Sequence, residues 1–137
     1  MPILNNLHSM TKHCRALVLS SLMLIGLGAA PAALADDAEA AKTIAGILVG
    51  LNHFPSADDK ATLAAIAEDD ANGMAVRSLA TAVAGIQHSA SAEGKAALEQ
   101  IVMSDMASAQ TKSLAKIVLG INHVPSAEAK ASLQAML

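Results

Sequence analysis

The sequence is poor in aromatic residues, cysteine and basic side chains. Of its 137 residues 1% are aromatic, with no tryptophan or tyrosine, and one is cysteine. A single cysteine excludes a disulfide-stapled domain. Nine basic side chains against twelve acidic ones, a net charge of −3, argue against a surface that binds nucleic acid, which needs clustered lysine and arginine. Hydrophobic residues make up 53% of the chain, which excludes a disordered protein.

The N-terminal part has the pattern of a secretory signal peptide. A short basic stretch at residues 12–15 precedes an almost wholly apolar stretch at residues 16–30. This apolar stretch is shorter than the roughly 20 residues that cross a bilayer. Residues 33–35 place alanine at the alternate positions that a signal peptidase accepts. We therefore expect residues 1–35 to be a signal peptide that is cleaved before Asp36.

Cleavage would change the composition of the chain. Cys14 precedes the apolar stretch, unlike a lipoprotein cysteine, and would leave with the signal, whether translation starts at Met1 or at Met10. Residues 36–137 then carry seven basic side chains against twelve acidic ones, a net charge of −5. We expect a periplasmic or otherwise secreted protein with no membrane span after cleavage.

The remaining chain repeats itself with a period of 35 residues and no insertion. The clearest markers are three histidines, His53, His88 and His123, and the segment at 51–63 is closely matched by the one at 121–133. Glycine, serine, lysine and leucine recur with the same spacing (Gly50, Gly85, Gly120; Ser56, Ser91, Ser126; Lys60, Lys95, Lys130; Leu63, Leu98, Leu133). Such a fixed period predicts a tandem array of one supersecondary unit.

Each repeat predicts two helices. Apolar residues with helical spacing form one buried stripe in the first helix and a shorter one in the second (Ile44, Ile47, Leu48, Leu51; Leu79, Val83, Ile86; Leu114, Ile117, Val118, Ile121; Leu63, Ile66; Leu98, Ile101; Leu133, Met136). Proline at 55 and 125 cannot continue the first helix. We expect the serine that follows, at 56, 91 and 126, to cap the second helix.

Small residues at equivalent sites suggest close helix packing. Alanine recurs in both helices (Ala45, Ala80, Ala115; Ala61, Ala96, Ala131). The repeated glycine at 50, 85 and 120 has two explanations, tight packing or a left-handed helix C-cap.

We therefore predict an all-α fold: three tandem 35-residue helix-turn-helix repeats, arranged either as a short α-solenoid or as a compact six-helix bundle. The signal peptide would occupy residues 1–35 and the helical-repeat domain residues 36–137. The repeats would span about 41–70, 76–105 and 111–137.

The three histidines are the main candidate functional residues. Neutral imidazole is the commonest metal ligand in proteins, so His53, His88 and His123 are candidates to bind zinc, copper, nickel or haem iron. Equivalent sites in stacked helices lie about 8–10 Å apart, which would bring together two imidazoles more readily than three. We favour a structural role in the turn, in which histidine bonds to free carbonyl groups and the Asn-His pair before Pro-Ser supplies the hydrogen bonds of the turn itself.

Two other candidate chemistries carry less weight. Ser56 and His53 lie near Asp58 and Asp59, as in a hydrolytic site, but such clusters within one capped turn usually serve local hydrogen bonding. The methionine pair Met103 and Met106 suggests copper(I) binding, with core filling as the favoured explanation.

The sequence predicts a non-enzymatic protein of the bacterial periplasm that binds other proteins through its helical repeats. Its partner would be another envelope protein or a second copy of the chain, with the C-terminal residues 136–137 as the expected contact surface. The first alternative is a periplasmic metal- or haem-binding protein that uses the three histidines, and the second is an envelope structural or stress protein without a small ligand.

Overall fold

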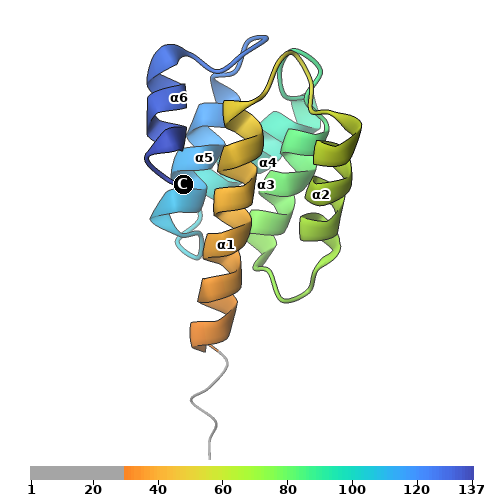
Figure 1. The fold of residues 1–137 in the computed structure, drawn as a ribbon. Coiled ribbons are helices and arrows are strands. Elements are labelled where there is room, and N and C mark those ends of the chain that lie inside the picture. Colours follow the sequence, from red (N-terminus) through yellow and green to blue (C-terminus); the bar gives the residue numbers. More distant parts are fainter. Residues whose placement is uncertain (1–29) are drawn as a thin grey trace, which may run out of the picture.

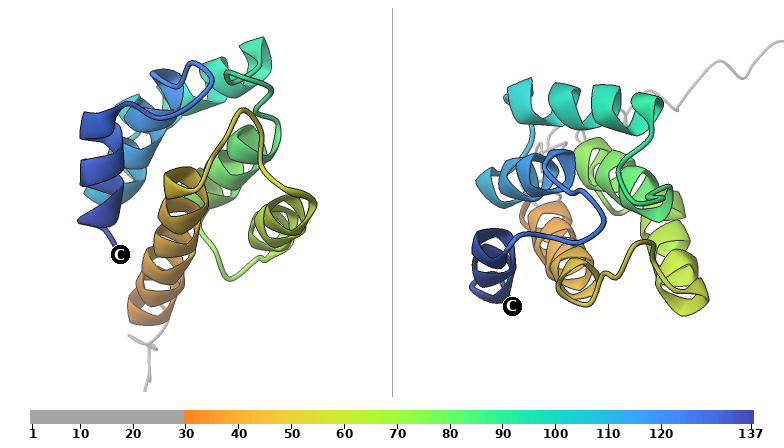
Figure 2. Two further views of the ribbon diagram at one scale, coloured as in Figure 1. Left: turned by 45° about the horizontal axis from the view of Figure 1, so that its top comes forward. Right: turned by 90° about the horizontal axis from the view of Figure 1, so that it is seen from above.

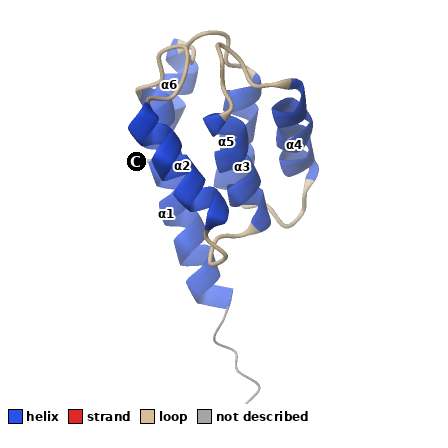
Figure 3. Ribbon diagram, turned by 90° about the vertical axis from the view of Figure 1, so that its right-hand side faces the viewer, coloured by secondary structure: helices blue, strands red, loops and turns tan. Residues whose placement is uncertain are grey.

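The computed structural model describes residues 30–137, with side chains from residue 36 onward, and within them the chain is all-helical, as predicted (Figures 1 and 3). Its six helices are α1 (Ala30–Val49), α2 (Ala57–Glu68), α3 (Met74–Ala84), α4 (Ala92–Met103), α5 (Ala109–Leu119) and α6 (Ala127–Gln134). No helix in this part of the chain is long and apolar enough to cross a membrane. The predicted signal peptide lies almost wholly outside the described residues, and its cleavage point falls within α1.

The helices form a closed bundle in which α1, α3 and α5 lie inside and α2, α4 and α6 lie outside (Figure 2). The inner helices contact one another in all three combinations. Among the outer helices, α2 packs mainly on α3, α4 packs on both α3 and α5, and α6 packs back on α1. Because the last helix contacts the first, α1 covers the apolar face that an open stack would leave free at the C-terminal end.

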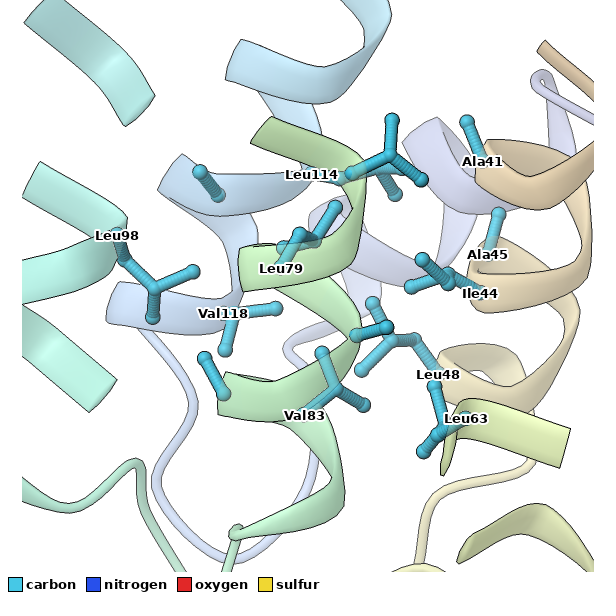
Figure 4. Close-up of a cluster of buried hydrophobic side chains, with 14 of the residues drawn as sticks. Ala41, Ile44, Ala45, Leu48, Leu63, Leu79, Val83, Leu98, Leu114 and Val118 are labelled. Carbon is cyan, nitrogen blue, oxygen red and sulfur yellow. The ribbon is translucent and has the colours of Figure 1, made fainter. Parts of the chain in front are cut away.

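The core is built from aliphatic side chains at corresponding positions of the three inner helices. Ile44, Leu79 and Leu114 are fully buried (Figure 4). The alanines that follow them, Ala45, Ala80 and Ala115, are also fully buried. Each outer helix adds one fully buried leucine (Leu63, Leu98 or Leu133). Small alanine side chains let the inner helices approach closely without aromatic residues. The alanines of the outer helices (Ala61, Ala96, Ala131) are exposed, so the expectation of close packing there is wrong.

The predicted serine caps are present at all three outer helices. The hydroxyl oxygens of Ser56, Ser91 and Ser126 accept hydrogen bonds from backbone N–H groups three residues later, at 3.0–3.1 Å. The Ser56 N–H also donates to the Asp59 carboxylate at 3.1 Å, which completes a capping box. These caps fix where each outer helix begins, and therefore the length of the turn before it.

Neither explanation offered for the repeated glycine is correct. None of the glycines has a positive φ, so a left-handed glycine cap is absent from the described residues. A Cβ added at Gly50, Gly85 or Gly120 would meet only carbonyl groups of its own helix, at 3.5–3.8 Å, which is ordinary contact. Nothing in the structure requires glycine at these three positions.

Replacing Gly85 with alanine should therefore stabilise the protein. Its φ of −84° suits any residue, and alanine lowers the conformational entropy of the unfolded chain, which is worth about 0.4–1 kcal/mol. The measurement is the urea midpoint of unfolding, compared with that of the native chain. A lower midpoint for Gly85→Ala would contradict the absence of close packing at this site.

Asp37 connects α1 to the start of α3. Its Oδ1 atom accepts a hydrogen bond from the N–H of Gly73, the N-cap residue of α3, at 2.6 Å. A carboxylate at a helix N-terminus also interacts favourably with the helix dipole. Asp37 follows the predicted cleavage point, so the processed chain would keep this contact.

Candidate functional site

The turns that follow the inner helices all lie at one end of the bundle, at the top of Figure 1 and facing the viewer in the right panel of Figure 2. Each turn begins with a buried aliphatic residue, at 51, 86 or 121, and ends at the serine cap of the next helix. The second residue after the aliphatic one is the repeated histidine. The anchored ends of the turns therefore place His53, His88 and His123 together.

The three histidines are joined through their backbones in a closed ring. The His53 N–H donates to the His123 carbonyl at 2.9 Å, the His88 N–H to the His53 carbonyl at 2.8 Å, and the His123 N–H to the His88 carbonyl at 2.6 Å. Each histidine thus donates one bond and accepts one. The ring gives the turns an approximately three-fold arrangement and links the first turn to the last.

All three histidines have a left-handed backbone. Their φ angles are 70°, 69° and 71°, and they are the only non-glycine residues with positive φ in the described part of the chain. In the first turn the N–H of Phe54 donates to the carbonyl of Asn52 at 2.9 Å, and in the third turn the N–H of Val124 donates to the carbonyl of Asn122 at 3.0 Å. A γ-turn with a positive central φ is rare and strained. Such strain concentrates at functional sites.

The imidazole rings lie close together and are exposed to solvent. The ring centres of His53 and His88 are 5.4 Å apart, those of His53 and His123 also 5.4 Å, and those of His88 and His123 4.9 Å. The rings meet edge to face, at angles of 70–89°. The separation of about 8–10 Å expected from stacked helices is therefore wrong, because the bundle closes and the turns converge.

Two of the three imidazoles are held by a neighbouring asparagine. The Nδ1 atom of His53 lies 2.7 Å from Oδ1 of Asn52, and that of His123 lies 2.8 Å from Oδ1 of Asn122. An amide oxygen only accepts, so Nδ1 carries the hydrogen and the neutral ring keeps its lone pair on Nε2. Nε2 is then the atom available to a metal ion, with the asparagine as the outer hydrogen-bond partner that ligating histidines usually have.

The spacing of the rings suits three ligands of one ion. Three imidazoles that bind one tetrahedral ion through nitrogen at about 2.0–2.1 Å have ring centres roughly 5 Å apart. Within residues 30–137, no three histidine, cysteine, aspartate or glutamate side chains are positioned so that they could hold a metal ion as they stand. Binding therefore requires at least one imidazole to turn. Among the hydrogen bonds of the described residues none holds the His88 ring, and the soft χ2 torsion of histidine lets this ring turn at small cost.

The hydrolytic grouping is not assembled. The Ser56 hydroxyl donates to Oδ2 of Asp59 at 2.7 Å and accepts from the Asp59 N–H, while the His53 ring bonds to Asn52. The serine is thus engaged in its capping box and not with the histidine. Ser56 therefore caps α2, as expected for a cluster that serves local hydrogen bonding.

The favoured explanation of Met103 and Met106 as core residues is wrong, whereas Met136 is partly buried against the core. Met103 and Met106 are 74% and 94% exposed, and Met74 is 84% exposed. Met74 and Met106 line a groove of about 500 Å³ between α3, α4 and the start of α5. Neither this groove nor the two smaller hollows found in the described residues is lined by any of the three histidines. None of these three hollows would therefore place a haem against the histidines.

Sequence reasoning missed two features of the site. The positive φ of the histidines has no sequence signal of its own, because asparagine and glycine are the usual left-handed residues. The contact of Asn52 and Asn122 with the imidazole rings was also missed, although the Asn-His pair had indicated hydrogen bonding within the turn.

Comparison with known proteins gives no indication of the function. No protein-family model matches the chain, and no curated protein or solved structure is detectably similar to it.

Proposed function

We propose that this chain is an exported, non-enzymatic helical-repeat protein that binds one transition-metal ion, in the first place zinc, through His53, His88 and His123. The observation that carries the proposal is the convergence of three exposed imidazoles with ring centres 4.9–5.4 Å apart. Three histidines leave the fourth position of a tetrahedral zinc ion open to water or to another ligand.

The backbone of the histidines supports a role for their side chains. A left-handed conformation costs most residues about 1–3 kcal/mol and suits glycine best, and asparagine, aspartate and histidine are enriched among the non-glycine residues that adopt it. The residues around the histidines differ among the turns (Asn52, Gln87, Asn122; Phe54, Ser89, Val124). Histidine nevertheless occupies the strained position in all three. A purely structural turn would be served better by glycine, so we assign the imidazole its own task.

A calorimetric titration of zinc into the full chain tests this proposal. We expect one ion per chain with a dissociation constant of about 1 μM or below, that is, a binding free energy of about −8 kcal/mol or stronger. His8, His13 and Cys14 are possible ligands in the leader, so the control is the same chain with His53, His88 and His123 all changed to asparagine, which tolerates positive φ. Binding that is absent from the native chain, or unchanged in this variant, would refute the proposal.

Export is the second part of the proposal. If the chain is cut after Ala35, the shortened α1 begins with three acids in its first turn, Asp36, Asp37 and Glu39. Negative charge there stabilises a helix. We expect the protein recovered from the periplasm of an expressing bacterium to have the intact mass of residues 36–137. A mass that includes the leader would contradict cleavage before Asp36.

Interaction with an envelope protein or with a second copy of the chain remains the other candidate function. The exposed methionines Met74, Met103 and Met106 favour it, because flexible apolar side chains are common at adaptable binding surfaces. Light scattering at increasing protein concentration tests self-association. A concentration-dependent mass that Met106→Glu abolishes would support it, and a constant monomer mass would remove it.

A further inference from the structure

The three histidines are not held equally, although they occupy the same position in their turns. The rings of His53 and His123 bond to the asparagine that precedes each of them, at 2.7 and 2.8 Å. The residue before His88 is Gln87, whose side chain is longer by one methylene group. Among the hydrogen bonds of the described residues, none involves the His88 ring.

The backbone hydrogen bond of the middle turn, at His88, also differs from those of the first and third turns. In the first and third turns the residue after histidine donates its N–H to the carbonyl of the asparagine that precedes histidine. In the middle turn the bond runs in the opposite sense, from the Gln87 N–H to the Ser89 carbonyl, and is longer, at 3.2 Å. The His88 turn thus lacks the γ-turn bond that closes the other two turns, and its ring lacks the asparagine contact that holds the other two rings.

The asparagine contacts have a chemical consequence for a metal ligand. A hydrogen bond from Nδ1–H to an amide oxygen fixes the tautomer and the ring orientation and makes Nε2 a stronger donor. His53 and His123 have both advantages before any metal arrives. His88 has neither, so the binding of an ion must select its tautomer and fix its orientation.

From this asymmetry, and resting on the proposed metal site, we infer that Asn52 and Asn122 are positioning residues that make His53 and His123 the fixed pair of ligands, and that His88 is the ligand displaced by an incoming chelator. The ion stays on the fixed pair while the incoming donor replaces the His88 nitrogen. The site is thereby suited to passing its metal on, because the exposed rings leave the ion accessible from solvent.

Substitutions before each histidine test this inference in the full chain. Loss of an outer partner of a metal ligand typically lowers metal affinity by 10–100-fold. We expect Asn52→Ala to weaken zinc binding by about that factor and the matched control Gln87→Ala to leave it unchanged. Gln87→Asn supplies the missing partner, so it should tighten binding by about 10-fold and slow zinc transfer to EDTA by a similar factor. His88→Asn should weaken binding less than His53→Asn does.

The outcomes separate this inference from the proposed function. If the native chain binds no zinc, the proposed function fails. If it binds zinc, equal losses for Asn52→Ala and Gln87→Ala, or no change in affinity and transfer rate for Gln87→Asn, would overturn the inference alone. Imidazole nitrogen shifts of the metal-free chain give a readout that a fold defect would not imitate. We expect a proton fixed on Nδ1 of His53 and His123 but not of His88, and three equivalent imidazoles would refute the asymmetry.

Discussion

Replacing His53 with asparagine is expected to lower the zinc affinity of the chain by about 100-fold. Four-ligand zinc sites bind with roughly 10–16 kcal/mol, so one ligand is worth about 3 kcal/mol, which is about a hundredfold in affinity. Asparagine keeps the left-handed backbone of residue 53 within its usual range, so the ring of backbone bonds is retained. The measurement is competition against a coloured zinc chelator.

Phe54→Ala is the matched control for this substitution. Phe54 is the next residue in the same turn, is 58% exposed and offers no metal ligand. We expect its removal to leave zinc affinity unchanged. A His53→Asn chain that binds zinc as tightly as the native chain, while its unfolding midpoint is unaltered, would show that this imidazole is not a ligand.

Replacing Leu79 with alanine is expected to lower the free energy of unfolding by about 3–5 kcal/mol. Leu79 is fully buried among the inner helices (Figure 4), and a leucine-to-alanine change in a core loses transfer free energy and leaves a cavity. A domain of this size has only about 5–15 kcal/mol in total. Chemical denaturation measures the loss, with the 94% exposed Met106, changed to alanine, as a control expected to stay within about 0.5 kcal/mol of the native chain. A loss below about 1 kcal/mol for Leu79→Ala would contradict the core assignment.

Zinc should restore part of the stability that the Leu79 substitution removes. The histidine ring joins the first turn to the last, so the site is complete only in the closed bundle. A ligand that binds the folded state alone stabilises it by about 4 kcal/mol at 1,000 times its dissociation constant. This gain should disappear when the three histidines are also changed to asparagine. An equal gain with and without the histidines would place the zinc elsewhere.

The helical fold and the starts of the three outer helices could be predicted from the sequence because they depend on local interactions, whereas α1 begins at Ala30, well before the predicted start of the first repeat. The spacing of Leu79 and Val83 predicted a buried stripe, and both are fully buried. Ser91 and Ser126 predicted helix starts, and both cap their helices. The closure of the bundle was not readable, since the contact of α6 with α1 depends on how successive helix pairs turn relative to one another. A 35-residue period is compatible with both an open and a closed arrangement.

For the candidate site, the sequence predicted the residue types but not their arrangement in space. Three histidines at one equivalent position indicated a possible metal site, but their separation depends on closure, and the stacked-helix spacing overestimated it. The left-handed backbone of His53 accompanies hydrogen bonds between turns that lie far apart in the sequence, so no local sequence pattern predicts it. Methionine exposure was also misjudged, because the spacing of Met103 and Met106 fits a helix face, whereas α4 ends at Met103 and leaves Met106 in the following turn.

X-ray absorption at the zinc edge is the most direct test of whether the three imidazoles share one ion. We expect the full chain, loaded with one equivalent of zinc, to show three imidazole nitrogens at about 2.0–2.1 Å from the metal. The variant with asparagine at residues 53, 88 and 123 should lose this signal. A native spectrum dominated by oxygen ligands, by sulfur from Cys14, or by a single imidazole would contradict the three-histidine site.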